Sequence, residues 1–108
     1  MADKISILIV DDEESVRDSL LNWFIEDGYE VEAAGNAKRA LQLLEEKDFN
    51  IILADIKMPG MDGLELHRRI RSLNRDTIVI IMTAFASVET AVQALKDGAY
   101  DYVTKPFD

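Results

Sequence analysis

The segment that decides the fold is residues 5–13, which reads ISILIVDDE. Its first six residues form a short, nearly continuous apolar run rich in β-branched side chains, which is typical of a strand buried on both faces of a parallel sheet. Two adjacent acids, Asp11 and Asp12, follow this strand directly. Open parallel sheets bind their ligands at the carboxyl ends of the strands. The segment therefore predicts an α/β fold with a candidate site at residues 11 and 12.

Strand-like and helical patterns alternate along the rest of the chain. Further strands are expected at residues 29–33, 50–54, 78–82 and 100–104. Apolar residues at helical spacing predict helices near residues 16–24, 37–44, 66–73 and 88–95, with Asn36 as an N-cap. This alternation predicts a doubly wound, five-stranded parallel sheet with helices on both faces. The last strand ends close to residue 108, so a final helix is expected to be missing, either trimmed or naturally absent.

Composition limits the classes of function. The chain has 108 residues, 48% of them hydrophobic, which predicts one globular domain over residues 1–108. It has no Cys, which excludes disulfides, Cys-ligated metals and thiol catalysis. Its net charge of −9 argues against direct nucleic-acid contact by this domain. No apolar run approaches the roughly 18 residues of a membrane span, and the start of the chain does not resemble a signal peptide. A cytoplasmic protein with no membrane partner is expected.

Polar residues follow four of the five expected strands. They are Asp11 and Asp12, Asp55, Thr83 and Lys105. Taken singly, the acids and the threonine have ordinary interpretations as helix caps or turn residues, and the lysine as a solvated charge. However, the carboxyl ends of parallel strands all lie along one edge of the sheet, so we expect these residues to converge there.

The chemistry of this set indicates phosphoryl transfer. Three carboxylates at one place repel one another, and a hard divalent cation would neutralise them. Oxygen ligands without His or Cys suit Mg²⁺, with Mn²⁺ as an alternative. A lysine such as Lys105 beside the metal would compensate the charge of a transferred phosphoryl group.

Several motifs in the chain resemble those of a known family. VDDE at residues 10–13, DIKMPGMDG at 55–63, TA at 83–84 and TKPF at 104–107 resemble the signature of the response-regulator receiver domain of bacterial two-component systems. GAYDY at residues 98–102 resembles the receivers of NtrC-type transcription activators. The resemblance covers essentially the whole chain. It implies a flavodoxin-like receiver fold with strand order 2-1-3-4-5, and a receiver domain at 1–108 that stops before its fifth helix.

The resemblance assigns roles to the acidic residues. Asp55 would be the phosphoacceptor that takes a phosphoryl group from a sensor histidine kinase. Asp12, Asp55 and the backbone carbonyl of Lys57 would ligate Mg²⁺ directly, and Asp11 would hold it through water.

It also implies how the signal would be transmitted. Lys105 would bind the phosphoryl oxygens, Thr83 would turn its hydroxyl toward them, and Tyr102 would move inward behind it. The surface of the helix near 88–95 and the strand near 100–104 would then change. This change would control transcription activation through downstream ATPase and DNA-binding domains, with a homodimer as a further partner. The domain would catalyse its own phosphorylation and dephosphorylation without being a turnover enzyme.

Two alternative functions make different demands on the sequence. A phosphate-independent pseudo-receiver that serves only as an interaction module would lack Asp12, Asp55 or Lys105, and all three are present. An aspartate-nucleophile phosphatase would carry its nucleophile after the first strand, with a second Asp two residues later. In this sequence the two acids after the first strand, Asp11 and Asp12, are adjacent, and the isolated Asp55 follows the third strand. Of the other polar and aromatic residues, His67 is expected on a solvated helix face and Trp23 in the core.

Overall fold

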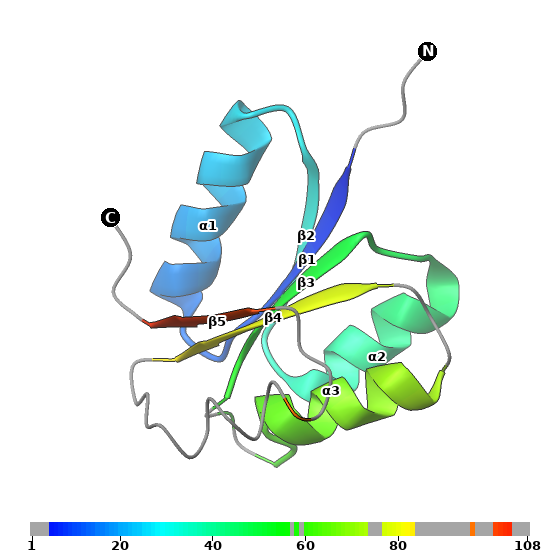
Figure 1. Cartoon of the computed structure of the whole chain (residues 1–108). Helices are drawn as coiled ribbons and strands as arrows, with labels where there is room; N and C mark the ends of the chain where they lie inside the picture. Colours follow the sequence, from blue (N-terminus) through cyan, green and yellow to red (C-terminus); the bar gives the residue numbers. More distant parts are fainter. Residues whose placement is uncertain are drawn as a thin grey trace.

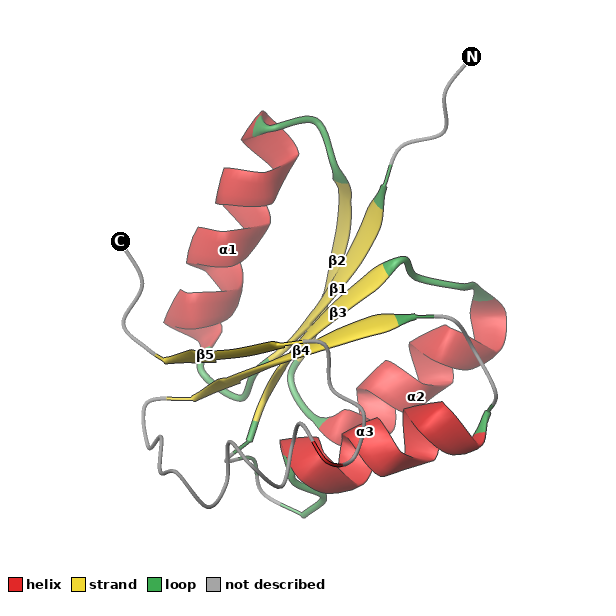
Figure 2. Cartoon of the chain, viewed as in Figure 1, coloured by secondary structure: helices red, strands yellow, loops and turns green. Residues whose placement is uncertain are grey.

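The computed structural model of the chain describes residues 5–56, 58, 60–73, 77–83, 96 and 101–104. Strands and helices alternate as the sequence predicts (Figure 2). In chain order they are β1 (Ser6–Val10), α1 (Glu14–Glu26), β2 (Glu30–Ala34), α2 (Ala37–Glu46), β3 (Ile51–Asp55), α3 (Gly63–Ser72), β4 (Ile78–Thr83) and β5 (Asp101–Thr104). The helix expected at 88–95 lies outside the described residues. No described helix is long and apolar enough to cross a membrane.

The five strands form one parallel sheet in the order β2-β1-β3-β4-β5, which confirms the expected topology. Helix α1 lies on one face of the sheet, and α2 and α3 lie on the other (Figure 1). Val10 at the end of β1 pairs with Ala54 in β3 and with Ala34 in β2. This register brings the residues that follow β1 next to the last residue of β3.

Alternating side chains of β1 build a core on each face of the sheet. Leu8 and Val10 belong to the larger cluster, which includes buried residues of α2 and α3. Ile7 and Ile9 belong to the smaller cluster, with Leu20 of α1. Fully burying an aliphatic side chain of this size contributes roughly 1.5–3 kcal/mol. Strand β1 is therefore held from both sides, up to the point where the acidic residues begin.

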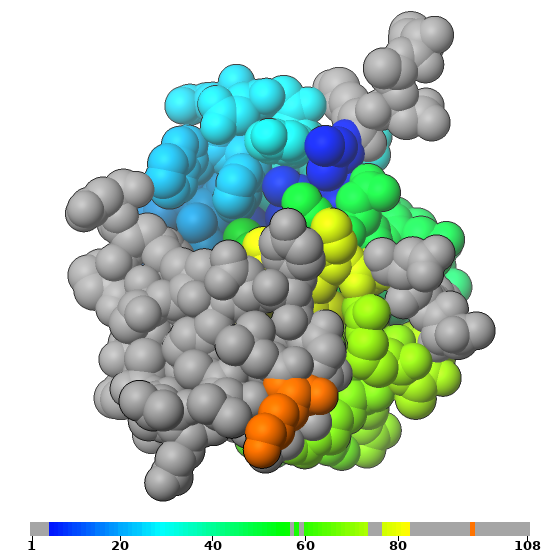
Figure 3. Space-filling model, in the orientation of Figure 1, coloured from blue at the N-terminus to red at the C-terminus, as the bar shows by residue number. Residues whose placement is uncertain are grey.

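The face that carries α1 is incompletely covered. Ile51 and Leu53 of β3 and Ile80 of β4 are only half-buried, and Ile78 is 38% exposed. In the space-filling view, atoms of β1, β3 and β4 reach the surface between the α1 side and the α3 side (Figure 3). A patch of aliphatic surface is thus left beside α1.

Two residues lie elsewhere than the sequence pattern predicts. His67 is fully buried, because it falls on the stripe of α3 formed by Gly63, Leu66 and Ile70 at helical spacing. The expectation of a solvated histidine is therefore wrong. Trp23 is 47% exposed, and its ring stacks on Phe24 with centroids 6.2 Å apart. The expectation that it lies in the core is also wrong, because it sits on the flank of the stripe of α1 that faces the sheet.

An ion pair links α2 to the edge strand β2. Lys47 Nζ lies 2.8 Å from a carboxylate oxygen of Glu32, and this hydrogen bond raises the pKa of Lys47 against the opposing effect of desolvation. Both side chains are exposed, so the pair adds little to stability.

The start of α2 confirms the expected cap and provides a stability test. The Asn36 side-chain oxygen accepts a hydrogen bond from the Arg39 amide at 2.8 Å. We expect Asn36→Ala to lower the free energy of unfolding by about 1 kcal/mol, because a first-turn amide loses its acceptor. Urea denaturation measures this, with Asn36→Ser as the matched control that keeps an acceptor. Equal stability of the Ala and Ser variants would contradict the assignment.

Candidate functional site

Asp11 begins the acidic segment and is tied to both of its neighbouring elements. Its amide donates to the Ala34 carbonyl at 3.1 Å, which extends the pairing of β1 with β2 by one residue. Its carboxylate accepts from the Glu13 amide at 2.9 Å, and its carbonyl accepts from Arg17 Nη1 of α1 at 2.8 Å. The residue is fully buried. The turn that carries the acids is therefore held by the sheet on one side and by α1 on the other.

Asp55 is the last residue of β3 and is 4% exposed. Its register partner is Met82 of β4, whose carbonyl accepts from the next amide, that of Ile56, at 3.1 Å. The first residue of α3, Gly63, packs on the same backbone: its amide donates to the Ile56 carbonyl at 2.9 Å. A Cβ on Gly63 would lie only 2.2 Å from the Asp55 carbonyl oxygen. The backbone of Asp55 is thus packed between β4 and the first residue of α3.

The loop between β3 and α3 is shaped by its own residues. Ile56 and Met58 are buried in the core, each with 8% exposure. Gly60 has a φ of +81°, a left-handed conformation that other residues rarely adopt. Asp62 caps α3 by accepting from the Glu65 amide at 2.9 Å. These contacts bring α3 back onto the end of β3, so that Asp62 has a capping role apart from the acidic site.

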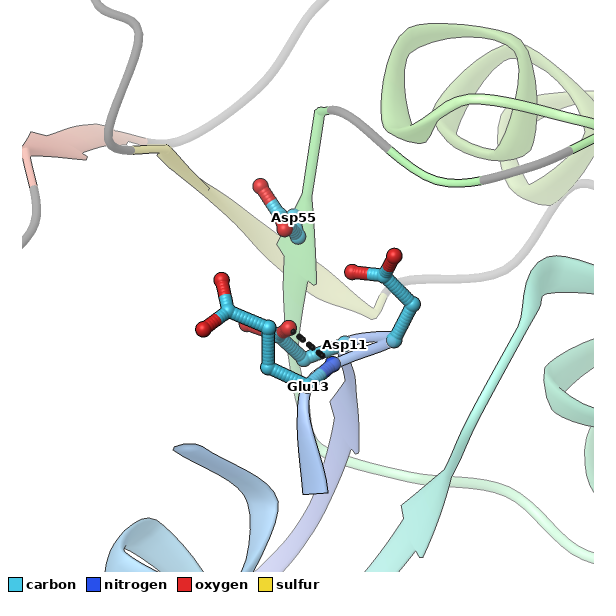
Figure 4. Close-up of side chains that lie close together, drawn as sticks. Asp11, Glu13 and Asp55 are labelled. Carbon is cyan, nitrogen blue, oxygen red and sulfur yellow. Dashed lines mark hydrogen bonds between the residues drawn. The ribbon is translucent and has the colours of Figure 1, made fainter. Parts of the chain in front are cut away.

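Four carboxylates meet at the carboxyl ends of β1 and β3. Asp11, Asp12, Glu13 and Asp55 each offer an oxygen, and these oxygens lie within 4.8 Å of one another. Asp11 and Asp55 are buried, whereas Asp12 and Glu13 are exposed, so the cluster opens to solvent on one side. In Figure 4 the Asp11 and Glu13 side chains, from the segment after β1, lie near Asp55 at the end of β3. The structure therefore brings together the three acids predicted from the sequence and adds Glu13.

This donor set fits Mg²⁺. All the donors are oxygens, which hard divalent cations prefer. Magnesium–oxygen distances of about 2.1 Å place opposite ligands about 4.2 Å apart, close to the spread of this cluster. Because some ligands of Mg²⁺ are normally waters, an exposed side with Asp12 and Glu13 also suits this ion.

The other predicted site residues are described less completely. Lys57 and Lys105 lie outside the described residues. Thr83 is the last residue of β4 and pairs with Thr104 of β5, and Tyr102 pairs with Ile81. The backbone thus carries Thr83 to the same edge of the sheet as Asp55.

Sequence reasoning missed two residues that shape the site, Arg17 and Gly63. Arg17 had a visible signal, because it is the only Arg among residues 1–32, a segment with ten acids. Gly63 stands in the DIKMPGMDG motif, whose Pro and Gly residues predict only a loop. Its close contact with the Asp55 backbone depends on how α3 returns to the sheet, which spacing alone does not reveal.

Comparison with known proteins agrees with this geometry. A family model described as the response regulator receiver domain matches residues 7–108. Regulatory protein AtoC of Escherichia coli is 50% identical over 102 residues, which are 94% of this chain and 22% of AtoC. The chain thus spans about a quarter of the length of the curated relatives that it matches.

Two solved structures extend the comparison. A Burkholderia pseudomallei response regulator with a phosphorylated aspartic acid, calcium ion and citrate superposes with a TM-score of 0.91 at 36% identity, covering 98% of this chain and 62% of that one. The beryllofluoride-activated NtrC4 receiver domain dimer gives a TM-score of 0.90 at 39% identity, covering 95% and 85%. The resemblance to receivers of NtrC type is confirmed.

Proposed function

The chain belongs to the response regulator receiver domain family, and we therefore propose that it is a phosphorylation-controlled switch whose phosphoacceptor is Asp55. The observation that carries this proposal is the cluster of four carboxylates around the buried end of β3. The phosphorylated aspartic acid in the similar Burkholderia pseudomallei structure supports it. The proposed unit is a receiver domain over residues 1–108.

The proposed reaction is an in-line transfer to Asp55. A carboxylate oxygen of Asp55 attacks the phosphorus of a phosphohistidine on a sensor histidine kinase, or of a small acyl phosphate. A P–O bond to Asp55 forms while the bond from phosphorus to the donor breaks, and the donor leaves with the electron pair. The contacts of Asp55 with β4 and Gly63 hold its backbone in place, which lowers the entropic cost of alignment.

The acidic cluster supplies the metal site for this step. Asp12, Asp55 and the Lys57 carbonyl would hold Mg²⁺ directly, and Asp11 would hold it through water. The bound ion would neutralise charge on the phosphoryl oxygens, with Lys105 assisting. The same groups would serve the later hydrolysis, in which a water oxygen bonds to phosphorus, the Asp55 O–P bond breaks and inorganic phosphate leaves. The domain thus catalyses its own phosphorylation and dephosphorylation without being a turnover enzyme.

The proposed output is a change of the surface near β4 and β5. An aspartyl phosphate adds negative charge and acceptor oxygens at the end of β3. Thr83 would turn toward it and Tyr102 would move inward. Couplings of this kind are typically ~1–3 kcal/mol, which shifts a population between two states of one fold.

The partners follow from the relatives. The matched segment is 22% of the regulatory protein AtoC, which supports further output domains in the full-length protein. We propose that these are a downstream ATPase domain and a DNA-binding domain that activate transcription in the cytoplasm. The NtrC4 receiver was solved as a dimer, which supports a homodimer here. The half-buried aliphatic patch beside α1 offers a surface for a second copy.

The metal requirement gives a direct test. We expect Asp12→Asn to raise the Mg²⁺ dissociation constant about tenfold or more, because a proposed direct ligand loses its charge. Isothermal titration calorimetry measures this. Asp18→Asn, an exposed position on α1, is the matched control for charge. Equal Mg²⁺ affinity of the two variants would contradict the metal site.

The modification itself can be tested on the same proteins. Intact-mass spectrometry after incubation with acetyl phosphate should show one phosphoryl adduct on the wild type with Mg²⁺ and none with EDTA. Asp12→Asn should be labelled much more slowly than Asp18→Asn. A wild-type protein that is never labelled in Mg²⁺ would favour the pseudo-receiver alternative.

A further inference from the structure

Among the residues that the structure describes, Arg17 is a cation held against the acidic turn of residues 11–13, and it comes from the first turn of α1. Its Nη1 donates to the Asp11 carbonyl oxygen at 2.8 Å. The side chain is partly buried, unlike those of Arg39, Arg68 and Arg69, which are exposed on α2 and α3. A guanidinium that donates a hydrogen bond to a backbone carbonyl of the acidic turn restrains the backbone conformation of that turn.

The same guanidinium also lies beside Gly35, in the connection between β2 and α2. A Cβ built on Gly35 would lie 3.4 Å from Arg17 Nη1 and 3.7 Å from its Cζ. A Cβ at this position would touch the guanidinium at an ordinary van der Waals distance, so a larger side chain would compete with it for space. Ala34, the preceding residue, accepts the hydrogen bond from the Asp11 amide. The Arg17 side chain of α1 thus lies where the acidic turn meets the end of β2.

These contacts are relevant to the metal because of what lies next to them. The Asp11 carbonyl and the Asp12 amide belong to the same planar peptide unit. A hydrogen bond that fixes the direction of this carbonyl therefore also fixes the orientation of the Asp12 backbone. The Asp11 carboxylate is separately engaged by the Glu13 amide. Arg17 therefore restrains the backbone beside two of the four clustered carboxylates, and it adds a positive charge next to them.

We propose that Arg17, seated against Gly35, is a positioning residue for the divalent cation site: it holds the Asp11–Asp12 backbone in the orientation that binds the metal. This inference rests on the proposed metal site and goes beyond it, because Arg17 is not among the groups proposed to hold the metal or the phosphoryl group. Removing a group that orients metal ligands without contacting the metal itself typically weakens metal binding 10–100-fold.

The test is the Mg²⁺ affinity of the unphosphorylated protein, measured by calorimetry beside urea denaturation in EDTA. We expect Arg17→Gln to raise the Mg²⁺ dissociation constant about tenfold. Arg39→Gln, which removes the same charge from the exposed face of α2, should bind as the wild type does. Arg17→Lys keeps the charge but lacks the guanidinium fork, and should weaken binding at least about threefold.

Gly35 provides a second, independent variant pair that leaves every charge in place. Gly35→Val should displace the guanidinium and weaken Mg²⁺ binding several-fold, whereas Gly35→Ala should bind normally because a 3.4 Å contact is an ordinary one. This pair keeps the test decisive if Arg17→Gln fails to fold.

The outcomes separate the two proposals. A wild type that binds no Mg²⁺ would overturn the metal site itself, and this inference with it. A wild type that binds Mg²⁺ while Arg17→Gln or Gly35→Val binds equally well, even with lower stability, would overturn the positioning role alone. Wild-type affinity of Arg17→Lys would also overturn it, because charge without the fork would then be sufficient.

Discussion

Asp55→Asn is expected to abolish phosphorylation by acetyl phosphate, lowering the rate by at least about 10³-fold. The amide has almost the same shape as the carboxylate but carries no charge and is a poor nucleophile. The residue ends β3 and is 4% exposed, so a substitute of equal size should leave the sheet intact. A time course of intact-mass spectra in saturating Mg²⁺ measures the effect.

The control for this variant must remove a charge without removing the nucleophile. Asp18→Asn does so from the exposed face of α1 and should be labelled at the wild-type rate. Circular dichroism establishes that both variants are folded. A rate for Asp55→Asn within about tenfold of the wild type would mean that another residue accepts the phosphoryl group, and the assignment of Asp55 would be wrong.

Gly63→Ala is expected to destabilise the protein strongly, although it adds only one methyl group. The new Cβ would lie 2.2 Å from the Asp55 carbonyl oxygen, 2.8 Å from its carbonyl carbon and 3.0 Å from the Ile56 Cα. All three atoms belong to the backbone and cannot rotate away. We expect the free energy of unfolding to fall by about 3 kcal/mol, as overpacking of a well-packed site does.

The same substitution should also impair phosphorylation, because α3 can accept the methyl group only by moving the end of β3. A displacement of about 1 Å at the nucleophile can lower a rate roughly 10²-fold. Urea denaturation and acetyl phosphate labelling measure the two effects. Gly35→Ala is the matched control, since its Cβ meets nothing closer than 3.4 Å. A Gly63→Ala protein as stable as Gly35→Ala would contradict the packing argument.

The sheet was predictable because its signals are local. The β-branched runs of β1 and β4 and the helical spacing between them predict a parallel sheet, and the cap at Asn36 depends on residues three apart. The convergence of Asp11, Asp12 and Asp55 follows from the same topology, since it needs only the strand ends to share an edge.

The details that sequence reasoning missed depend on contacts between elements. His67 is buried because it lies on the face of α3 that also carries Gly63, Leu66 and Ile70, and packing decides which face of the helix is turned inward. Trp23 is exposed because the stripe of α1 that faces the sheet passes beside it. Gly63 approaches the backbone of Asp55 on another element, which no local pattern reveals. Its isolation among acids marks Arg17 in the sequence, but that signal does not show that it donates to the Asp11 carbonyl.

The most direct test of the central claim is to locate the phosphoryl group in the wild-type protein. After labelling with acetyl phosphate and Mg²⁺, borohydride reduction converts an aspartyl phosphate into homoserine, which peptide mass spectrometry can assign to a position. Our account predicts a single modified residue, Asp55, and none when EDTA replaces Mg²⁺. Modification at a different residue, or no modification in the presence of Mg²⁺, would contradict it.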